Sequence, residues 1–101
     1  MSYQSALEVV GDPTRRRILE LLRARPRPVG ELADHLPVSR PAVSRHLRLL
    51  REAGLVVDEA RGTRRIYRLR PEGFRSIVAY WDGFWSDALA QFKHYAEKEQ
   101  S

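Results

Sequence analysis

A chain of 101 residues, 43% of them apolar, has the size and composition of one folded domain with a single core. It contains no cysteine, which excludes disulfides, thiolate metal sites, thiol redox sensing and a cysteine nucleophile. No stretch approaches the roughly 18 consecutive apolar residues of a membrane span, and residues 1–6 lack the features of an export signal. We therefore expect a cytoplasmic protein that has no contact with a membrane.

The net charge of +5 is distributed unevenly along the chain. Residues 1–70 carry 15 arginines, no lysine and 8 acidic residues, a net charge of +7, whereas residues 71–101 carry 3 basic and 5 acidic residues, a net charge of −2. Arginine suits bidentate contacts with phosphate and guanine, so this balance indicates an anionic partner such as nucleic acid. A basic surface that is only solvated would have the same composition. The positions of the arginines must therefore distinguish a nucleic-acid partner from a solvated surface.

The N-terminal part predicts a short amphipathic segment over residues 3–10 and then a helix. Asp12 is suited to cap this helix and Pro13 to its first turn, and the helix should run to about Ala24. Its inward residues recur at helical spacing: Ile18, Leu21 and Leu22. The two prolines in residues 25–28 then predict a stiff linker.

Two further helices are predicted over residues 29–36 and 40–53, joined by a sharp turn at Pro37 and ended by Gly54. Ser39 is a good N-cap for the second of them. Val43, Leu47 and Leu50 would face inward, and Arg40, Ser44, Arg45, Arg48 and Arg51 largely outward. This arrangement is typical of a DNA-binding helix-turn-helix, in which Arg40, Ser44 and Arg45 would face base edges in the major groove. We also expect Arg48, on the same outer face, to contact the DNA. The alternative is a solvated helix in an ordinary three-helix bundle.

Residues 55–59 and 65–69 read as two short strands, and Gly62 permits a tight reversal between them. Arg61 and Arg64 would lie at the tip of this β-hairpin, with Arg65 beside them. From there they could reach phosphates or a narrow minor groove, as the wing of a winged helix does. A basic turn without function is the alternative for an isolated hairpin.

The chain from Pro71 onward predicts one long helix. Its apolar residues alternate at intervals of four and three residues and form a continuous seam: Phe74, Val78, Trp81, Trp85, Ala88, Phe92 and Tyr95. Seven of the nine aromatic residues lie between residues 74 and 95, which is too much apolar surface for an isolated helix in water. Part of the seam should pack on its own domain, and the rest predicts a two-fold homodimer interface shared with the N-terminal segment.

Several motifs together resemble the ArsR-type, or arsenic-repressor-like, winged-helix regulators over roughly residues 3–98. They are Asp12-Pro13-Thr14-Arg15 with Ile18-Leu19, the run from Ser39 to Leu47, Glu52-Ala53-Gly54-Leu55-Val56, and Gly62 to Leu69. The resemblance implies a dimeric repressor that binds a palindromic operator. By position, it implies DNA contacts from Ser39, Arg40, Ser44, Arg45 and His46 in the recognition helix and from Arg61, Arg64 and Arg65 in the wing. Of these, His46 could equally pack between helices.

The sequence departs from metal-sensing members of that family. Their pair of thiolate ligands aligns here with Ala33 and His35, so that site is absent. A second familiar site on the last helix is only partly matched by Asp82, His94 and Glu97, because Asp82 is one position displaced. Solvated polar residues explain these side chains as well, and we predict neither a metal nor another cofactor.

The predicted fold class is therefore mainly α with a small β-hairpin, a winged helix-turn-helix that dimerises through its terminal helices. We expect one domain over residues 1–101, with the helices, recognition helix and wing in residues 3–70 and a dimerisation helix in residues 71–98. The predicted function is sequence-specific binding of double-stranded DNA at an inverted repeat by a transcriptional repressor. Alternatives are nonspecific nucleic-acid binding, including RNA, and a protein-docking winged helix.

An enzyme is not expected, because the three histidines are scattered and no glycine-rich phosphate loop occurs. The aromatic C-terminal helices could border a pocket for a small organic ligand that releases the DNA. An aromatic core without a ligand explains the same residues.

Overall fold

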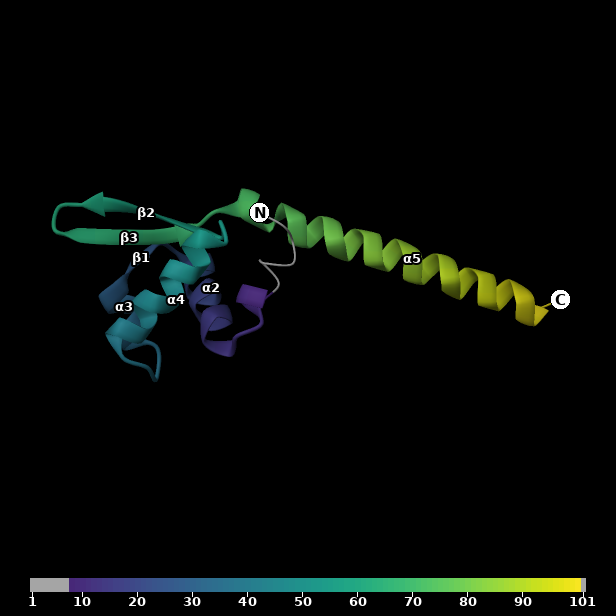
Figure 1. Cartoon of the computed structure of the whole chain (residues 1–101), viewed down its shortest axis with the longest axis horizontal. Coiled ribbons are helices and arrows are strands. Elements are labelled where there is room, and N and C mark those ends of the chain that lie inside the picture. Colours follow the sequence, from purple (N-terminus) through teal and green to yellow (C-terminus); the bar gives the residue numbers. More distant parts are fainter. Residues whose placement is uncertain (1–7, 101) are drawn as a thin grey trace.

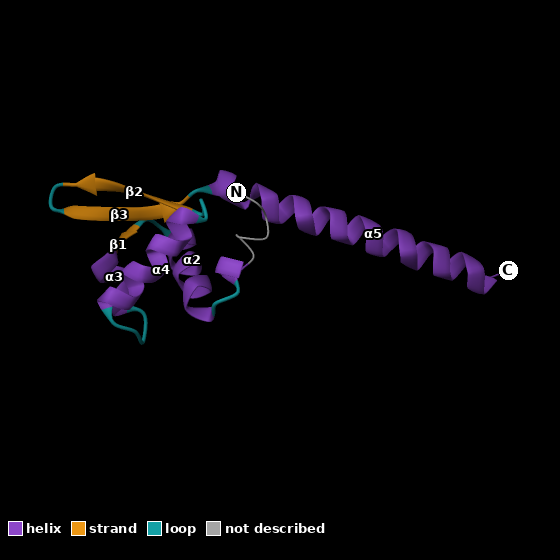
Figure 2. Cartoon of the chain, in the orientation of Figure 1, coloured by secondary structure: helices purple, strands orange, loops and turns teal. Residues whose placement is uncertain are grey.

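The computed structural model describes residues 8–100, which form two parts of different shape (Figure 1). Helices α2, α3 and α4 and a small sheet make a compact part, and α5 projects from it, so that the molecule measures 69 × 25 × 21 Å (Figure 2). Most of the amphipathic segment expected at residues 3–10 lies outside the described range. None of the described helices combines the length and the hydropathy needed to cross a membrane.

Helix α2 (Pro13–Ala24) begins and ends as the sequence predicts. The carboxylate of Asp12 accepts a hydrogen bond of 3.0 Å from the backbone N–H of Arg15, and Pro13 occupies the first turn. Both features stabilise the start of a helix, since the first N–H groups have no partner within it. The buried residues of α2 are Ile18, Leu21 and Leu22, as expected.

The segment at Arg27–Pro28, predicted as a linker, is instead a short strand, β1. It pairs antiparallel with β3, Arg27 opposite Tyr67 and Pro28 opposite Ile66, and gives a three-stranded sheet in the order β1-β3-β2. Proline lacks an N–H donor, which an edge strand tolerates. A strand of two residues has no periodicity, so the sequence pattern could not reveal it.

The helix-turn-helix consists of α3 (Val29–Asp34) and α4 (Arg40–Glu52). Helix α3 ends two residues earlier than predicted, because Leu36 already forms a tighter i to i−3 hydrogen bond with Ala33. The Ser39 hydroxyl accepts the backbone N–H of Ala42 at 3.3 Å and caps α4. The helix stops one residue before the predicted end, and Gly54 follows with a φ of +77°.

The β-hairpin is formed by β2 (Val56–Arg61) and β3 (Arg64–Leu69), both longer toward the turn than predicted. Arg61 pairs with Arg64, so only Gly62 and Thr63 form the turn. Gly62 has a φ of +62°, which glycine adopts without steric cost.

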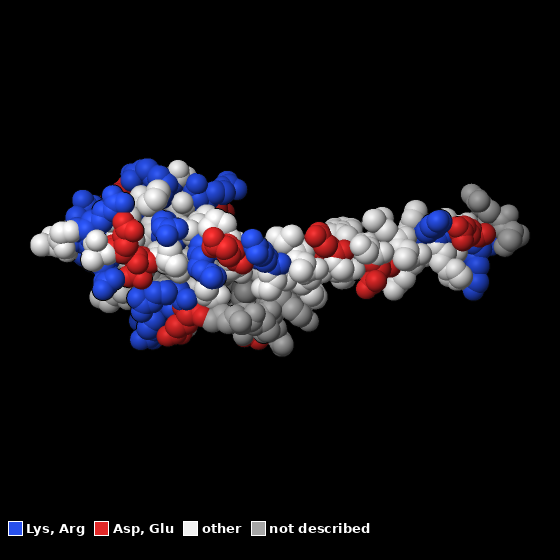
Figure 3. Space-filling model, turned by 90° about the horizontal axis from the view of Figure 1, so that it is seen from above, with Lys and Arg blue, Asp and Glu red and all other residues white. Residues whose placement is uncertain are grey.

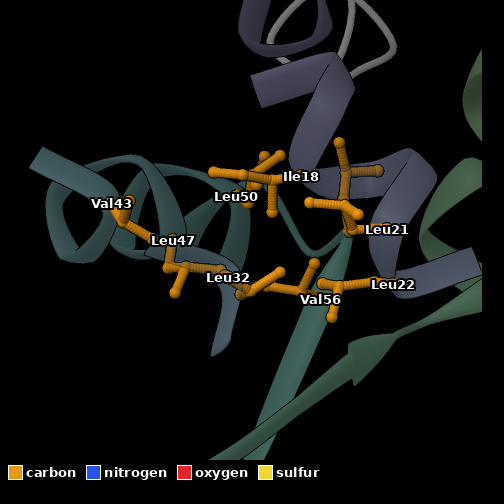
Figure 4. Close-up of a cluster of buried hydrophobic side chains, with 10 residues drawn as sticks. Ile18, Leu21, Leu22, Leu32, Val43, Leu47, Leu50 and Val56 are labelled. Carbon is orange, nitrogen blue, oxygen red and sulfur yellow. The ribbon is translucent and has the colours of Figure 1, made fainter. Parts of the chain in front are cut away.

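One hydrophobic core holds the compact part together (Figure 4). It joins α2, α3, α4 and the start of β2 through Ile18, Leu21, Leu22, Leu32, Val43, Leu47, Leu50, Ala53, Leu55 and Val56. Because α4 contributes its whole inner face to this core, the orientation of its outer face is determined by packing.

The start of the C-terminal segment is a turn of 3-10 helix, η1 (Pro71–Phe74), before α5 (Arg75–Gln100), rather than one helix from Pro71 as predicted. Gly73 lies so close to Gly54, two residues after the end of α4, that a Cβ atom built on it would be 1.8 Å from the backbone oxygen of Gly54. Phe74 is half-buried and packs on the core of its own domain. The turn η1, from which α5 continues, therefore packs directly against the residues that follow α4.

Candidate nucleic-acid interface

The outer face of α4 carries the residues that the sequence predicts to contact DNA. Val43, Leu47 and Leu50 are completely buried on the inner face. The polar residues on the opposite side are exposed, namely Ser39 at the cap, Arg40, Ser44, Arg45 and Arg48. The N-terminal half of α4 thus presents hydroxyl and guanidinium groups, which can donate hydrogen bonds to base edges and phosphates.

His46 differs from its neighbours on α4. It is half-buried, and its Nδ1 lies 3.3 Å from a terminal nitrogen of Arg15 on α2. Arg15 also donates from Nε to the backbone oxygen of Val9 at 2.6 Å. These contacts favour the helix-packing interpretation of His46 that the sequence left open.

The same contacts influence Asp12 at the start of α2. The hydrogen bond from the backbone N–H of Arg15 has the largest effect and lowers the pKa of the Asp12 carboxyl below its ordinary value. Burial opposes it in part, and the charges of Arg15 and His46 lower the pKa further. Asp12, Arg15 and His46 therefore form one polar contact that joins the beginning of α2 to α4.

The wing arginines Arg61, Arg64 and Arg65 are all exposed. Arg61 forms an ion pair with Glu59 at 2.7 Å, and both side chains are more than half exposed. Arg65 forms an ion pair of 2.6 Å with Asp58, whose side chain is only 7% exposed. Arg61 and Arg65 are therefore both bonded within the wing, but only Arg65 is bonded to a buried partner.

The wing and α4 face each other across a hollow of about 540 Å³. Arg40 and Ser44 line it from α4, and Thr63, Arg64 and Arg65 from the wing. A second hollow, of about 530 Å³, runs along α4 past Ser44, Arg45, Arg48 and Arg51. Both hollows include Ser44 and Tyr67, so the arginines of α4 and of the wing lie on one surface, although Glu31 also lines the first hollow. The space-filling view shows Lys and Arg side chains gathered over the compact part, with Asp and Glu among them, and sparse along α5 (Figure 3).

Three residues of this surface were not predicted to act in it. Tyr67 lines both hollows, although an aromatic residue in a short strand reads as core from its sequence alone. Arg51 and Asp58 form an ion pair of 3.4 Å between the end of α4 and β2. An acidic residue in a basic region was the one signal that could have drawn attention to Asp58.

The predicted dimer seam is largely uncovered. Val78, Trp81 and Trp85 are 55%, 45% and 57% exposed, and Phe92 and Tyr95 are 68% and 63% exposed. Ala88 is half-buried, and Phe74 packs on the core. The ring of Phe84 contacts those of Trp81 and Trp85 edge to face, with centroid distances of 5.7 and 5.9 Å. These contacts lie along α5 and leave most of its aromatic surface accessible.

The side chains named as a weak metal candidate do not converge. Within residues 8–100 no three histidine, aspartate or glutamate residues are close enough to bind one ion. Asp82 and His94 lie twelve residues apart on one straight helix, a separation of about 18 Å.

Comparisons with known proteins agree on one family. Residues 12–57 match the family described as bacterial regulatory protein, arsR family. The HTH-type transcriptional regulator Rv2034 of Mycobacterium tuberculosis is 47% identical over 98 residues, which cover 97% of this chain and 92% of that protein. The transcriptional repressor SdpR of Bacillus subtilis is 36% identical over 58 residues, 57% of this chain and 64% of that one. A crystal structure of a "Possible transcriptional regulator for arsenical resistance" superposes with a TM-score of 0.75 at 46% identity, covering 87% and 92% of the two chains.

Proposed function

The chain belongs to the arsR family of bacterial regulatory proteins and is a DNA-binding transcriptional regulator rather than an enzyme. We propose that two copies of it bind one inverted-repeat DNA site. The observation that carries this proposal is the basic surface formed by α4 and the wing on either side of one hollow. The nonspecific and protein-docking alternatives are not favoured by the family.

We propose that α4 is the recognition helix and enters the major groove with its N-terminal half. Exposed Arg40, Ser44 and Arg45 support this role, since a groove about 12 Å wide admits a helix and arginine binds guanine through two hydrogen bonds. Ser39 and Arg48 flank them and are suited to phosphate contacts. His46 would act indirectly, by holding α4 against α2 through Arg15.

The wing is proposed to contact the DNA backbone beside the helix. Arg61 and Arg64 lie next to the two-residue turn, where they can reach phosphates without disturbing the core. Such contacts contribute affinity that falls as salt rises, because binding releases counterions from the DNA.

The homodimer is proposed from the seam of α5. An isolated chain leaves Trp81, Trp85 and Phe92 about half exposed or more, and a large contiguous apolar surface of this kind indicates a protein interface. In such a dimer a two-fold axis relates the two recognition helices, which can then enter successive major grooves roughly 34 Å apart. In this view residues 1–101 are one unit, with residues 71–98 serving dimerisation.

Repression in the cytoplasm is the proposed mode of action. A relative named as a transcriptional repressor supports the sign of regulation. A small organic ligand next to the α5 aromatics stays a prediction, since these rings lie at the surface of the single chain.

Selection of binding sites from a random duplex DNA pool tests the proposal, followed by titration of the selected site at several salt concentrations. We expect an inverted repeat bound by two chains. Arg45→Ala should reduce affinity for this site more than for unrelated DNA, by about 1 to 3 kcal/mol. Arg68→Ala is the matched control, because Arg68 is exposed on β3 but lies outside the residues lining either hollow.

Failure to enrich any motif, or equal losses in Arg45→Ala and Arg68→Ala, would contradict the proposed recognition surface. A competition with duplex RNA distinguishes the RNA alternative, since the deep and narrow major groove of A-form RNA does not admit a helix.

A further inference from the structure

Asp58 is an acidic residue enclosed by the basic surface just described. Its side chain is 7% exposed, whereas the arginines that it contacts, Arg51 and Arg65, are 50% and 62% exposed. A negative charge opposes the binding of DNA, so its presence at this place calls for a structural reason.

The two oxygens of Asp58 contact different elements. One accepts a hydrogen bond of 2.6 Å from a terminal nitrogen of Arg65 on β3, and the other accepts one of 3.4 Å from Arg51 at the end of α4. The carboxylate therefore joins the wing to the recognition helix.

Arg65 keeps most of its binding capacity in this arrangement. A guanidinium group has five N–H donors in a rigid plane, and the contact with Asp58 uses only one terminal nitrogen. The Arg65 side chain is 62% exposed, so other donors stay accessible while the contact with Asp58 restricts its orientation. Binding DNA then costs less side-chain entropy than it would for a freely rotating arginine.

We propose that Asp58 is a positioning residue, which orients Arg65 relative to the recognition helix so that the wing and α4 contact DNA together in one register. This inference rests on the proposed DNA surface. In nonspecific binding the arginines are attracted to the DNA backbone in many registers, and a fixed orientation of Arg65 adds little affinity. In the specific complex, insertion of α4 into the groove fixes the position of the wing on the DNA backbone, and an oriented Arg65 adds more affinity.

The neighbouring acid, Glu59, provides a matched control. It lies on the same strand and forms an ion pair of 2.7 Å with Arg61 of that strand, but its side chain is 53% exposed, and among residues 8–100 no ion pair joins it to α4. Asp58→Asn and Glu59→Gln each remove one negative charge from the wing. Only Asp58→Asn disturbs a link between the wing and the recognition helix.

The experiment measures dissociation constants for the selected inverted repeat and for an unrelated duplex of equal length, with the full-length chain. The variants are Asp58→Asn, Glu59→Gln, Arg65→Ala and the double variant of Asp58→Asn with Arg65→Ala. The readout is the ratio of the two dissociation constants on one preparation. Partial unfolding reduces both affinities equally and does not change this ratio.

We expect Asp58→Asn to bind unrelated DNA as tightly as the wild type or more tightly, because one repelling charge is gone. Its preference for the inverted repeat should nevertheless fall about tenfold, the size expected for a hydrogen bond to a charged group. Glu59→Gln should change the preference by at most about twofold. The double variant should lose no more preference than Arg65→Ala alone.

Three results would overturn the inference. The first is an unchanged preference in Asp58→Asn, and the second is an unchanged preference in Arg65→Ala. The third is a further loss when Asp58→Asn is added to Arg65→Ala, since Asp58 would then act by another route. Arg45→Ala separates these cases from failure of the proposed function, because it should still lose preference when only the role of Asp58 is wrong.

Discussion

The compact part and α5 use the same kinds of apolar side chain in opposite ways. Leu47 and Leu50 on α4 are completely buried within the chain, whereas Leu89 and Phe92 on α5 are 63% and 68% exposed. The compact part is thus complete as a core, and its exposed surface is rich in arginine. Helix α5 has a regular seam whose aromatic residues from Trp81 to Tyr95 stay largely exposed, and the proposed dimer would cover them.

A substitution in the seam of α5 should have the largest effect, which falls on assembly of the dimer. Trp85→Asp places a charge in the seam, and we expect the dissociation constant of the dimer to rise by at least about 100-fold, because a central tryptophan commonly dominates an interface. The melting temperature of the compact part should change little. Sedimentation at several concentrations checks both the assembly state and its strength.

Ala90→Asp is the control for this variant, since helical spacing places the exposed Ala90 on the side of α5 opposite the seam. It should leave the dimer intact. A Trp85→Asp protein that still sediments as two chains at micromolar concentration would be evidence against the proposed interface.

A smaller effect is expected at the junction of the two parts. Gly73→Ala brings a Cβ atom to 1.8 Å from the Gly54 oxygen, so η1 must move away from the end of α4. We expect a loss of about 1 to 3 kcal/mol of unfolding free energy, the range for overpacking, together with weaker binding to the inverted repeat. Denaturant unfolding and DNA titration measure the two effects.

Gly83→Ala tests the same substitution where there is space, because a Cβ in the middle of α5 has no atom within 4 Å apart from its chain neighbours and the backbone of its own helix. It should stabilise the helix by about 0.5 to 1 kcal/mol. If Gly73→Ala and Gly83→Ala change the unfolding free energy and the DNA affinity equally, the close contact between Gly73 and Gly54 does not determine how α5 is attached.

The smallest effect should come from the polar contact in the compact part. The lowered pKa of Asp12 means that its charge stabilises the folded chain above the ordinary value of 3.8, and that this contribution is lost as the pH falls through the lower folded-state value. Asp12→Asn can still cap α2 but does not titrate. It should reduce the unfolding free energy by about 0.5 kcal/mol at pH 7, with a smaller difference from the wild type at pH 3.

Denaturant unfolding at the two pH values checks this, with Asp87→Asn on α5 as a variant of equal charge change. A difference between the wild type and Asp12→Asn that stays constant from pH 7 to pH 3 would show that the charge of Asp12 has no part in stability.

Local chemistry made much of the winged domain predictable. Ser39 and Asp12 cap the helices they precede, and Gly54 and Gly62 occupy positions of positive φ, because each effect involves only a few neighbouring residues. The outer face of α4 followed from its periodicity. Dimerisation and the individual DNA contacts stay predictions, since both involve a second molecule.

Contacts between distant segments were not accessible from the pattern. The pairing of Arg27 with Tyr67 gives β1, and the ion pairs of Asp58 depend on where the end of α4 meets the hairpin. The approach of Gly73 to Gly54 likewise depends on tertiary packing. Such features require the relative placement of elements, which one sequence does not contain.

The uncovered seam of α5 also determines how the regulator would respond to its own abundance. If the DNA-binding unit is the proposed dimer, mass action couples assembly to DNA occupancy. At concentrations where most chains are single, the amount of dimer rises with the square of the chain concentration, and doubling the supply of protein raises it about fourfold. If the proposed dimer forms through the exposed Trp85 and Phe92, occupancy of the DNA site would therefore respond more steeply to protein dosage than it would for a protein that binds as a single chain.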